Sequence, residues 1–392
     1  MNDGLVEYLT GNLDRYLADL RVLAGIDSGS DDKQGVDAVV DWLQRRLAAD
    51  GFRIERDRQE QRGDNLIARR FGSGTTRILL LGHADTVYAR GTAATRPVRI
   101  DGDRLLGPGT CDMKAGILSG VYALNALIDA GWDDFAEVAL LVVSDEETAP
   151  RASVSLLERE GARHDVVLTL EAARENGDIV SARKGVRWFS AEATGRSAHA
   201  GVEPEKGCSA TLALAHFIVA ANQLNGLKAG MTVNTGAIEG GGSPSIVVER
   251  ARARFDLRAW TDADLDELEV AFRALSLRPF VPGVMFDVNL EPGSNCPAMP
   301  RTDGVRQLEQ IAVEIAADLG FVLRGAATGG ASDISYAGSG GTPGLDGLGP
   351  IGGLDHGPDE YILRSSIVPR QVLLARLLVA IGKRGSWKRM NA

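Results

Sequence analysis

The fold of this chain is constrained most by apolar runs that end abruptly in acidic side chains. In one of them, Val138 to Val143 is entirely aliphatic and is followed, after one serine, by Asp145, Glu146 and Glu147. An unbroken aliphatic run of this kind predicts a strand buried on both faces. Neighbouring residues of an extended chain point in opposite directions, so Glu146 and Glu147 can take different roles, one as a metal ligand and one as a general base. A solvated acidic turn is the alternative interpretation.

Two further apolar runs end in the same way. Residues 77–81 lead to His83 and Asp85, and residues 165–170 lead to Glu171. The carboxyl ends of strands are where ligands bind in open α/β sheets, so we expect these side chains to meet at one edge. Histidine together with carboxylates is a donor set for zinc or a similar divalent ion. Asp85 lies on the same side of the extended chain as His83, where a group that holds the imidazole is expected.

Glycine-rich stretches supply two more candidates. Asp112 lies in GPGTCDMKAGI, a turn into an apolar helix, where it is either a metal ligand or only a helix cap. The stretch does not match a nucleotide-binding loop in spacing or lysine placement. His356 ends a second glycine-rich stretch, which allows close approach of the backbone to a site. Of the other histidines, we predict His216 to be a core residue, from its apolar neighbours, and His164 to lie at the surface.

Composition narrows the class of protein. With 24% charged and 44% hydrophobic residues the chain is a globular protein, and at 392 residues it can form two domains. A net charge of −10 and a pI near 5.2 argue against nucleic acid or an anionic membrane as partner. The acidic N-terminus does not have the pattern of a secretory signal, and no run of 18 apolar residues is present, so we expect a cytoplasmic protein.

The pattern of elements predicts an α/β fold interrupted by a second domain. Residues 1–183 and 297–392 alternate helical spacing, beginning with Leu5 to Leu20, with short strands. Residues 184–296 follow a β-α-β-β-α-β order, typical of a ferredoxin-like α+β unit, and include a long strand from Ile246 to Trp260. One face of that strand carries a polar row that we interpret as a solvated sheet face: Arg250, Arg252, Arg254, Asp256 and Arg258.

These residues resemble a known family. The motifs GHADTVYARG, GPGTCDMKAG, SDEET, SAHAG and TGGASD occur in order, followed by the H-x-x-x-E-Y-I pattern that starts at His356. Together they are similar to the co-catalytic zinc exopeptidases, which include glutamate carboxypeptidase, aminoacylases and succinyl-diaminopimelate desuccinylase. The likeness covers essentially the whole chain and is strongest to the glutamate carboxypeptidase branch. It implies a zinc-binding catalytic domain, with a mixed sheet between helices, interrupted by a ferredoxin-like lid that also dimerises.

The resemblance implies two zinc ions per chain, with cobalt or manganese as possible substitutes. The residues that it implies for the site are His83 and Glu171 at one ion, Glu147 and His356 at the other, Asp112 bridging both, Asp85 behind His83, Glu146 as general base toward the water that bridges the metals, His199 at the scissile carbonyl and Arg258 at the substrate's free carboxylate. In relatives the histidine corresponding to His199 often acts across a dimer interface, so we expect a homodimer through the lid.

The function expected is therefore hydrolysis of an amide bond in a small peptide or N-acyl amino acid with a free carboxylate. Dipeptidase, aminoacylase and desuccinylase activities remain alternatives, and a non-catalytic binding protein on this fold is the rival class. Glutamate-cleaving relatives have asparagine and proline where this chain has Ser245 and Val248, and an additional arginine that the segment EPGSNCPA lacks. Preference for glutamate therefore does not carry over.

Overall fold

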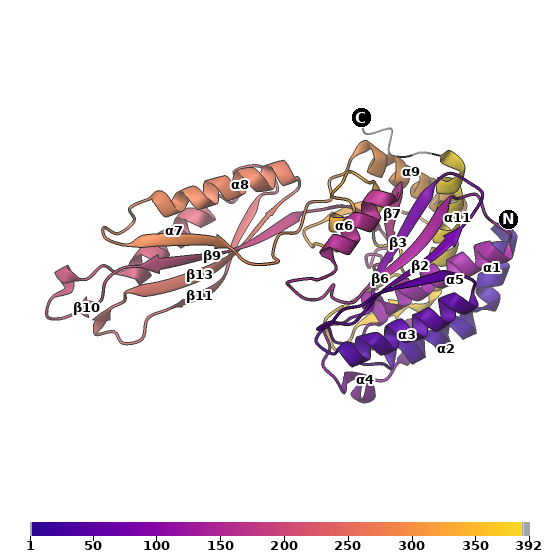
Figure 1. Ribbon diagram of the computed structural model, residues 1–392, viewed down its shortest axis with the longest axis horizontal. Coiled ribbons are helices and arrows are strands. Elements are labelled where there is room, and N and C mark those ends of the chain that lie inside the picture. Colours follow the sequence, from indigo (N-terminus) through magenta and orange to yellow (C-terminus); the bar gives the residue numbers. More distant parts are fainter. Residues whose placement is uncertain (1, 386, 388–392) are drawn as a thin grey trace. The chain divides into compact units, whose positions relative to one another are not determined.

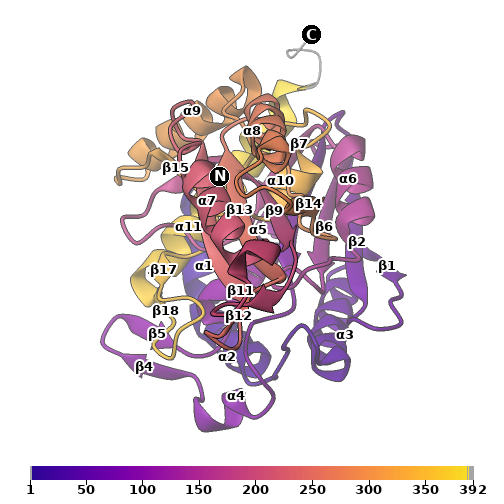
Figure 2. The same ribbon diagram turned by 90° about the vertical axis from the view of Figure 1, so that its left-hand side faces the viewer.

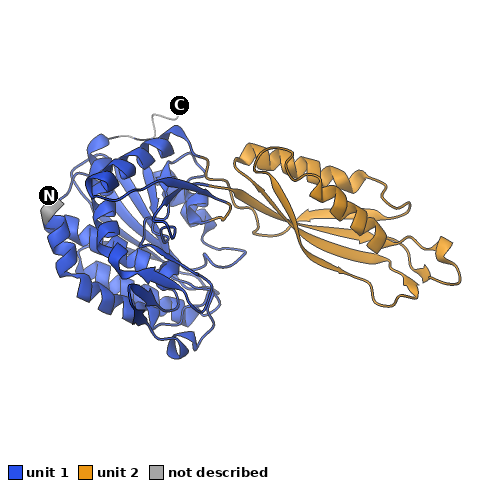
Figure 3. Ribbon diagram, turned by 180° about the vertical axis from the view of Figure 1, so that it is seen from behind, with its two compact units in different colours: residues 1–182, 301–328, 332–392 blue, residues 183–300, 329–331 orange. Residues whose placement is uncertain are grey.

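The computed structural model describes residues 2–385 and 387, which form two compact units (Figure 3). Unit 1 contains residues 1–182, 301–328 and 332–392, and unit 2 contains residues 183–300 and 329–331. The sequence predicts domain boundaries at 183/184 and 296/297, and these boundaries stay a prediction. The α/β class with an inserted α+β unit is confirmed.

Unit 1 is built on a six-stranded mixed sheet in the order β1-β2-β6-β3-β7-β16. Its strands are β1 (Arg53–Asp57), β2 (Asn65–Phe71), β3 (Arg77–His83), β6 (Glu137–Val143), β7 (Val166–Thr169) and β16 (Gly344–Leu345). The strands β6, β3, β7 and β16 pair in parallel, and β1 and β2 are antiparallel to their neighbours. The aliphatic side chains of β6 and β3 are buried, as continuous apolar runs predict for strands covered on both faces.

Helices cover this sheet, with α5 on one side and α6 on the other in Figure 1. The helices of unit 1 are α1 (Asn2–Gly11), α2 (Leu13–Ala24), α3 (Lys33–Ala49), α4 (Thr92–Thr95), α5 (Ala115–Asp129), α6 (Val154–Arg163), α9 (Asp303–Asp318), α10 (Asp333–Ala337) and α11 (Ile367–Arg384). Asp32 and Thr302 cap α3 and α9 by accepting the backbone N–H three residues on. The single helix expected from Leu5 to Leu20 is divided at Asn12 into α1 and α2.

The last helix is long and apolar enough to cross a membrane by composition, but it packs as a core helix. Its candidate segment, Arg364–Arg384, has 72% of its most apolar window buried inside the protein. It contacts α1, α5 and α9, so its apolar surface is used within unit 1. Near its start, the buried Arg370 donates hydrogen bonds to the carbonyl oxygens of Gly177, Gly347 and Gly349. One guanidinium therefore holds the glycine-rich stretch that leads to His356.

Shorter strands complete unit 1. Two of them, β4 (Arg99–Asp101) and β5 (Arg104–Leu106), form a hairpin and join β17 (Gly352–Gly353) and β18 (Tyr361–Leu363) in a four-stranded sheet. A separate pair is formed by β8 (Ile179–Arg183) and β15 (Gly325–Thr328). The irregular segment η1 (Thr110–Lys114) connects β5 to α5 and carries Asp112.

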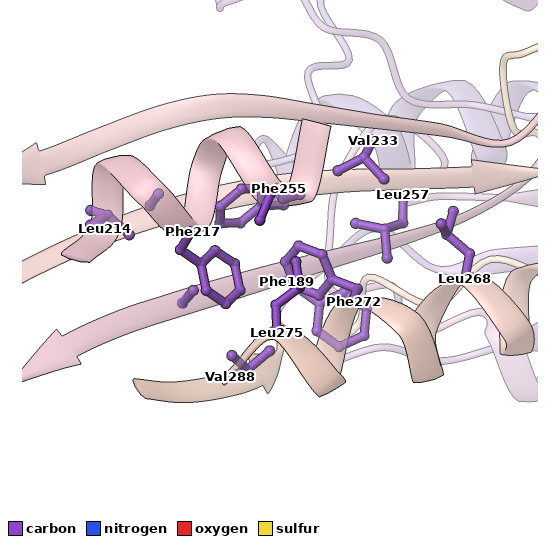
Figure 4. Packing of buried hydrophobic residues seen from close by; sticks show 14 of the residues in the cluster. Phe189, Leu214, Phe217, Val233, Phe255, Leu257, Leu268, Phe272, Leu275 and Val288 are labelled. Atoms are coloured by element: carbon purple, nitrogen blue, oxygen red, sulfur yellow. The ribbon is translucent and has the colours of Figure 1, made fainter. Parts of the chain in front are cut away.

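Unit 2 is a four-stranded antiparallel sheet, in the order β11-β13-β9-β14, with two helices on one face (Figure 2). Its elements are β9 (Gly185–Thr194), β10 (Ala198–His199), α7 (Ala210–Asn222), β11 (Thr232–Gly240), β12 (Ile246–Val247), β13 (Arg250–Ala259), α8 (Asp262–Ala274) and β14 (Met285–Leu290). Phenylalanines from the sheet and both helices form its core, with Phe217, Phe255 and Phe272 in mutual contact (Figure 4). The β-α-β-β-α-β order is confirmed.

Several local expectations were wrong. His164 is fully buried, because its Nε2 lies 3.6 Å from the buried Glu137 carboxylate. Its Nδ1 lies 2.6 Å from the Glu160 carbonyl oxygen. His216 is exposed on the outer side of α7, where one helix face meets the core and the opposite face does not. The long strand from Ile246 to Trp260 is divided, since β12 pairs with β10 and only β13 enters the main sheet.

Candidate metal centre

The carboxyl ends of β3, β6 and β7 meet at one edge of the unit 1 sheet because the three strands are parallel. In register, His83 lies beside Val143, and Leu81 lies beside Thr169. The side chains expected from three separate stretches are thereby brought together at this edge. Glu147 follows β6 and Glu171 follows β7 within a few residues.

Asp112 lies between two histidines and offers a different oxygen to each. Its Oδ1 is 2.8 Å from Nε2 of His83, and its Oδ2 is 3.3 Å from Nε2 of His356. Each histidine also faces a second carboxylate: His83 Nε2 is 3.7 Å from Glu171 Oε1, and His356 Nε2 is 3.2 Å from Glu147 Oε2. The five side chains thus divide into two donor sets that share Asp112.

The electrostatics of these residues fit bound cations. Burial and the neighbouring Asp112 raise the pKa of Glu147 to about 8 and that of Glu171 well above its usual range. Although burial opposes it, hydrogen bonds from both histidines lower the pKa of Asp112. The buried Oε1 of Glu147 has no hydrogen-bond partner. Crowded carboxylates with an unpartnered oxygen need positive charge, and a nitrogen and oxygen donor set suits zinc or a similar divalent ion.

Three of the five side chains lie close enough together to hold one ion. One possible ligand atom from each of His83, Asp112 and Glu147 lies within 4.8 Å of the others. Divalent ions bind nitrogen and oxygen donors at about 2.0–2.2 Å, so two ligand atoms of one ion lie no more than about 4.4 Å apart, slightly less than this limit. These three side chains therefore fit a site for a divalent ion.

Asp85 organises the site from behind. Its Oδ1 lies 3.3 Å from Nδ1 of His83, whose ring also contacts the Asp85 carbonyl oxygen at 3.0 Å. The Asp85 carboxylate further accepts the backbone N–H groups of Glu146 and Glu147, each at 3.1 Å, and the hydroxyl of Ser30 at 2.6 Å. One buried carboxylate therefore fixes the imidazole and the loop after β6 together, as expected for a residue behind a metal ligand.

Glu360 holds the segment that carries Asp112. Its Oε1 accepts the backbone N–H groups of Cys111 at 2.7 Å and Asp112 at 3.0 Å, and its Oε2 accepts that of Gly109 at 2.9 Å. Burial raises the pKa of Glu360, and these N–H donors oppose the rise. Because Glu360 lies four residues beyond His356, it ties the two loops on either side of the shared carboxylate together.

Glu146 projects beside the ligands and contacts an arginine that the motifs did not single out. Arg151 donates from Nη2 to Glu146 Oε1 at 2.6 Å and from Nη1 to Asp333 Oδ1 at 2.6 Å. Burial raises the pKa of Glu146, and the Arg151 guanidinium opposes this. Asp333 and Glu360 were already visible in the TGGASD and H-x-x-x-E-Y-I motifs, but nothing in the local sequence marks Arg151.

His199 and Arg258 belong to unit 2 and not to the unit that carries the ligand set. His199 lies on β10 with an exposed ring, and its Nδ1 accepts the backbone N–H of Gly201 at 3.1 Å. This contact makes Nδ1 an acceptor, so a neutral ring carries its proton on Nε2 and can donate it to an oxygen. The loop with Ser245 lies beside it, since the Ser245 carbonyl accepts from Ala200 at 2.9 Å.

Arg258 is the last member of the polar row on β13. The row alternates with buried side chains along the strand, which confirms the predicted two faces. Its Nε and Nη2 donate to Asp256 at 2.8 and 2.7 Å, and its Nη1 donates to the Gly329 carbonyl oxygen. A guanidinium has five N–H donors, so two remain beyond these three contacts. Asp256 therefore orients the Arg258 guanidinium, and its two remaining N–H donors suit a carboxylate.

Comparison with known proteins assigns the chain to a family. A sequence profile described as peptidase family M20/M25/M40 matches residues 79–380. The chain belongs to this family. Carboxypeptidase G2 of Pseudomonas sp. (strain RS-16) is 28% identical to this M20 chain over 371 residues, which are 93% of the chain and 88% of the relative. Succinyl-diaminopimelate desuccinylase of Methylobacterium radiotolerans is 27% identical over 89% of this chain and 92% of its own length.

Solved structures show the same fold. Aminopeptidase PepT from Bacillus cereus superposes on this M20 chain with a TM-score of 0.81 at 22% identity, covering 94% of this chain and 99% of that one. The profile match, together with the two relatives, confirms the family expected from the motifs. Members of M20 are metal-dependent hydrolases of the metallopeptidase and amidohydrolase kind, and this chain presents a candidate metal site.

Proposed function

We propose that this M20 protein uses two zinc ions to hydrolyse the amide bond of a small peptide or N-acyl amino acid and releases an amino acid with a free carboxylate. The observation that most supports this proposal is that the two carboxylate oxygens of Asp112 face different histidines, His83 and His356. Glu171 and Glu147 complete the two donor sets. The relatives named carboxypeptidase G2 and desuccinylase support this class of reaction.

The chain's own residues divide the work. Two divalent ions in such a site supply an activated water and stabilise negative charge on the substrate oxygen. Glu146 accepts a proton from the attacking water and returns it to the leaving amine. His199 donates from Nε2 to the oxygen of the scissile carbonyl, a role supported by the acceptor state of its Nδ1. Arg258 binds the substrate carboxylate with the donors that Asp256 leaves available.

Unit 2 also supports a homodimer. Leu212 and Val219 are 52% and 59% exposed on the outer face of α7, and Ile238 is 65% exposed on the edge strand β11. An edge strand beside an apolar helix face favours pairing with a second copy. We propose that this surface forms the dimer and that His199 acts in the partner's site. Sedimentation at micromolar concentration tests this, because a monomer would remove the argument for action between subunits.

Hydrolysis is tested with a panel of N-acetyl amino acids, N-succinyl amino acids and dipeptides, each compared with its C-terminal amide. The protein is first stripped with a chelator and then loaded with zinc, cobalt or manganese. We expect no turnover without metal, recovery at about two ions per chain, and preference for free carboxylates. Absence of hydrolysis across the panel with every metal would contradict the proposal. The pattern across the panel separates carboxypeptidase, aminoacylase, dipeptidase and desuccinylase activities.

A further inference from the structure

Arg151 lies between two carboxylates at the end of β6. Its guanidinium contacts Glu146 through Nη2 and Asp333 through Nη1, both at 2.6 Å. The side chains of Arg151 and Glu146 are each 13% exposed and that of Asp333 is 2% exposed. Such charge-assisted contacts, removed from most of the solvent, are stronger than surface ion pairs.

The segment that carries Arg151 is itself held in place. The carboxylate of Asp145 accepts the backbone N–H groups of Ala152 and Ser153 and the hydroxyl of Ser153, which fixes the start of α6. On the other side, the guanidinium carbon lies 5.5 Å from the centre of the Tyr336 ring on α10. The arginine is therefore supported by two elements besides its contact with Glu146.

We propose that Arg151 is a positioning residue that fixes the general base, Glu146, and that Asp333 in turn fixes Arg151. This inference rests on the function proposed above for Glu146. A glutamate side chain has three rotatable bonds, and neighbouring carboxylates such as Glu147 and Asp112 repel it toward other rotamers. The contact at Oε1 opposes that repulsion and thereby sets the direction of Oε2, the oxygen left to receive a proton.

A structural ion pair between the loop after β6 and α10 would show the same distances but different consequences. If Arg151 acts only through Glu146, its removal has no effect on turnover once Glu146 can no longer act as a base. If it only stabilises the loop, its removal affects unfolding and metal binding instead. The two roles are therefore separable in a double-mutant cycle.

The cycle compares wild type, R151M, E146Q and the double variant R151M/E146Q, all loaded with zinc. We expect R151M to lower kcat by about tenfold to a hundredfold, since displacement of a reacting group by about 1 Å costs up to about a hundredfold, while KM changes little. R151K should recover part of kcat, and D333N should lower kcat less than R151M. The double variant should be no slower than E146Q. The control R159M removes an arginine of α6 whose side chain is 60% exposed and should match wild type.

Crystal structures of zinc-loaded wild type and R151M give a readout that does not depend on activity. We expect one Glu146 rotamer in wild type and several, or a different one, in R151M. An unchanged Glu146 rotamer in R151M, or equal kcat losses from R151M in the wild-type and E146Q backgrounds, would overturn the proposal. A wild type that hydrolyses no substrate would refute the proposed function, whereas the rotamer comparison would still decide whether Arg151 positions Glu146.

Discussion

Replacement of Glu360 by glutamine should weaken the site without touching a ligand. In the protein, one carboxylate accepts three backbone N–H groups from the Gly109–Asp112 segment. A glutamine keeps one oxygen, which can still accept from Cys111 and Asp112, but its NH₂ group then faces the N–H of Gly109. Two donors pointing at each other cannot form a hydrogen bond, so the contact at 2.9 Å is lost.

The magnitude follows from these contacts. Losing one charge-assisted hydrogen bond in a buried site costs about 1.5–3 kcal/mol, and the two that remain fall to about half their strength when the charge is removed. We therefore expect a loss of about 3–6 kcal/mol in the free energy of unfolding, or roughly 6–20 °C in Tm. Because the same segment carries Asp112, metal affinity should fall by about 10–100-fold.

Thermal unfolding with chelator and with increasing zinc measures both effects, because a metal that binds only the folded state stabilises it by an amount that grows with the logarithm of the zinc concentration divided by Kd. The matched control is D359N, which removes the same charge from the adjacent, exposed side chain. We expect D359N to behave as wild type. An E360Q protein with wild-type Tm and wild-type zinc dependence would refute the view that Glu360 holds the Asp112 segment.

Three further predictions concern single residues. E146Q should retain both metal ions by elemental analysis while kcat falls by about 10²–10⁴-fold; a variant with normal turnover would reassign the base. R258A should lower kcat/KM by about tenfold to a hundredfold on substrates with a free carboxylate and far less on their amides; equal losses on both would return Arg258 to a structural role. Burial alone would raise the pKa of Glu137, but His164 and Arg69 lower it from 4.5 to about 2. The contribution of that carboxylate to stability is therefore complete above pH 4.5 and is lost as the pH falls through about 2, a change of about 3 kcal/mol. Urea unfolding across this range should show a shallower acid dependence for E137Q, and identical pH profiles would contradict the assignment.

The residues at the carboxyl ends of the strands were predictable because a buried strand can be recognised from its local sequence. Aliphatic runs such as Val138 to Val143 can only be satisfied by cover on both faces, and parallel strands bring their carboxyl ends together. That logic led from sequence to His83, Glu171 and the pair Glu146 and Glu147 without any knowledge of strand pairing, whereas the roles within that pair came from the family resemblance. The observed parallel register of β3, β6 and β7 is its physical confirmation.

Contacts between distant loops could not be predicted in the same way. Arg151 meets Asp333 across 182 positions, and Glu360 meets Cys111 across 249. Neither contact is indicated by hydrophobic periodicity or by local propensity, because both depend on how the loops pack over the folded sheet. His164 was expected at the surface but is buried, and His216 was expected in the core but is exposed. The cause is related, because tertiary packing decides which helix face is covered and where a buried ion cluster forms.

The order in which the chain is synthesised determines when the side chains around Asp112 become available. His83, Asp112 and Glu171 precede the inserted unit, whereas His356 follows it. Unit 2 has its own core, and its ends leave side by side because Arg183 pairs with Met299, so it can fold while unit 1 still lacks β16 and α11. At about 5–20 residues per second, the interval between Glu171 and His356 lasts roughly 10–40 s. During that time four of the five side chains exist and His356 is missing. If the proposed site holds two ions, chains stalled on the ribosome before residue 356 should therefore bind at most one ion each. In the proposed two-ion site, uptake of the second ion thus reports that synthesis has passed His356.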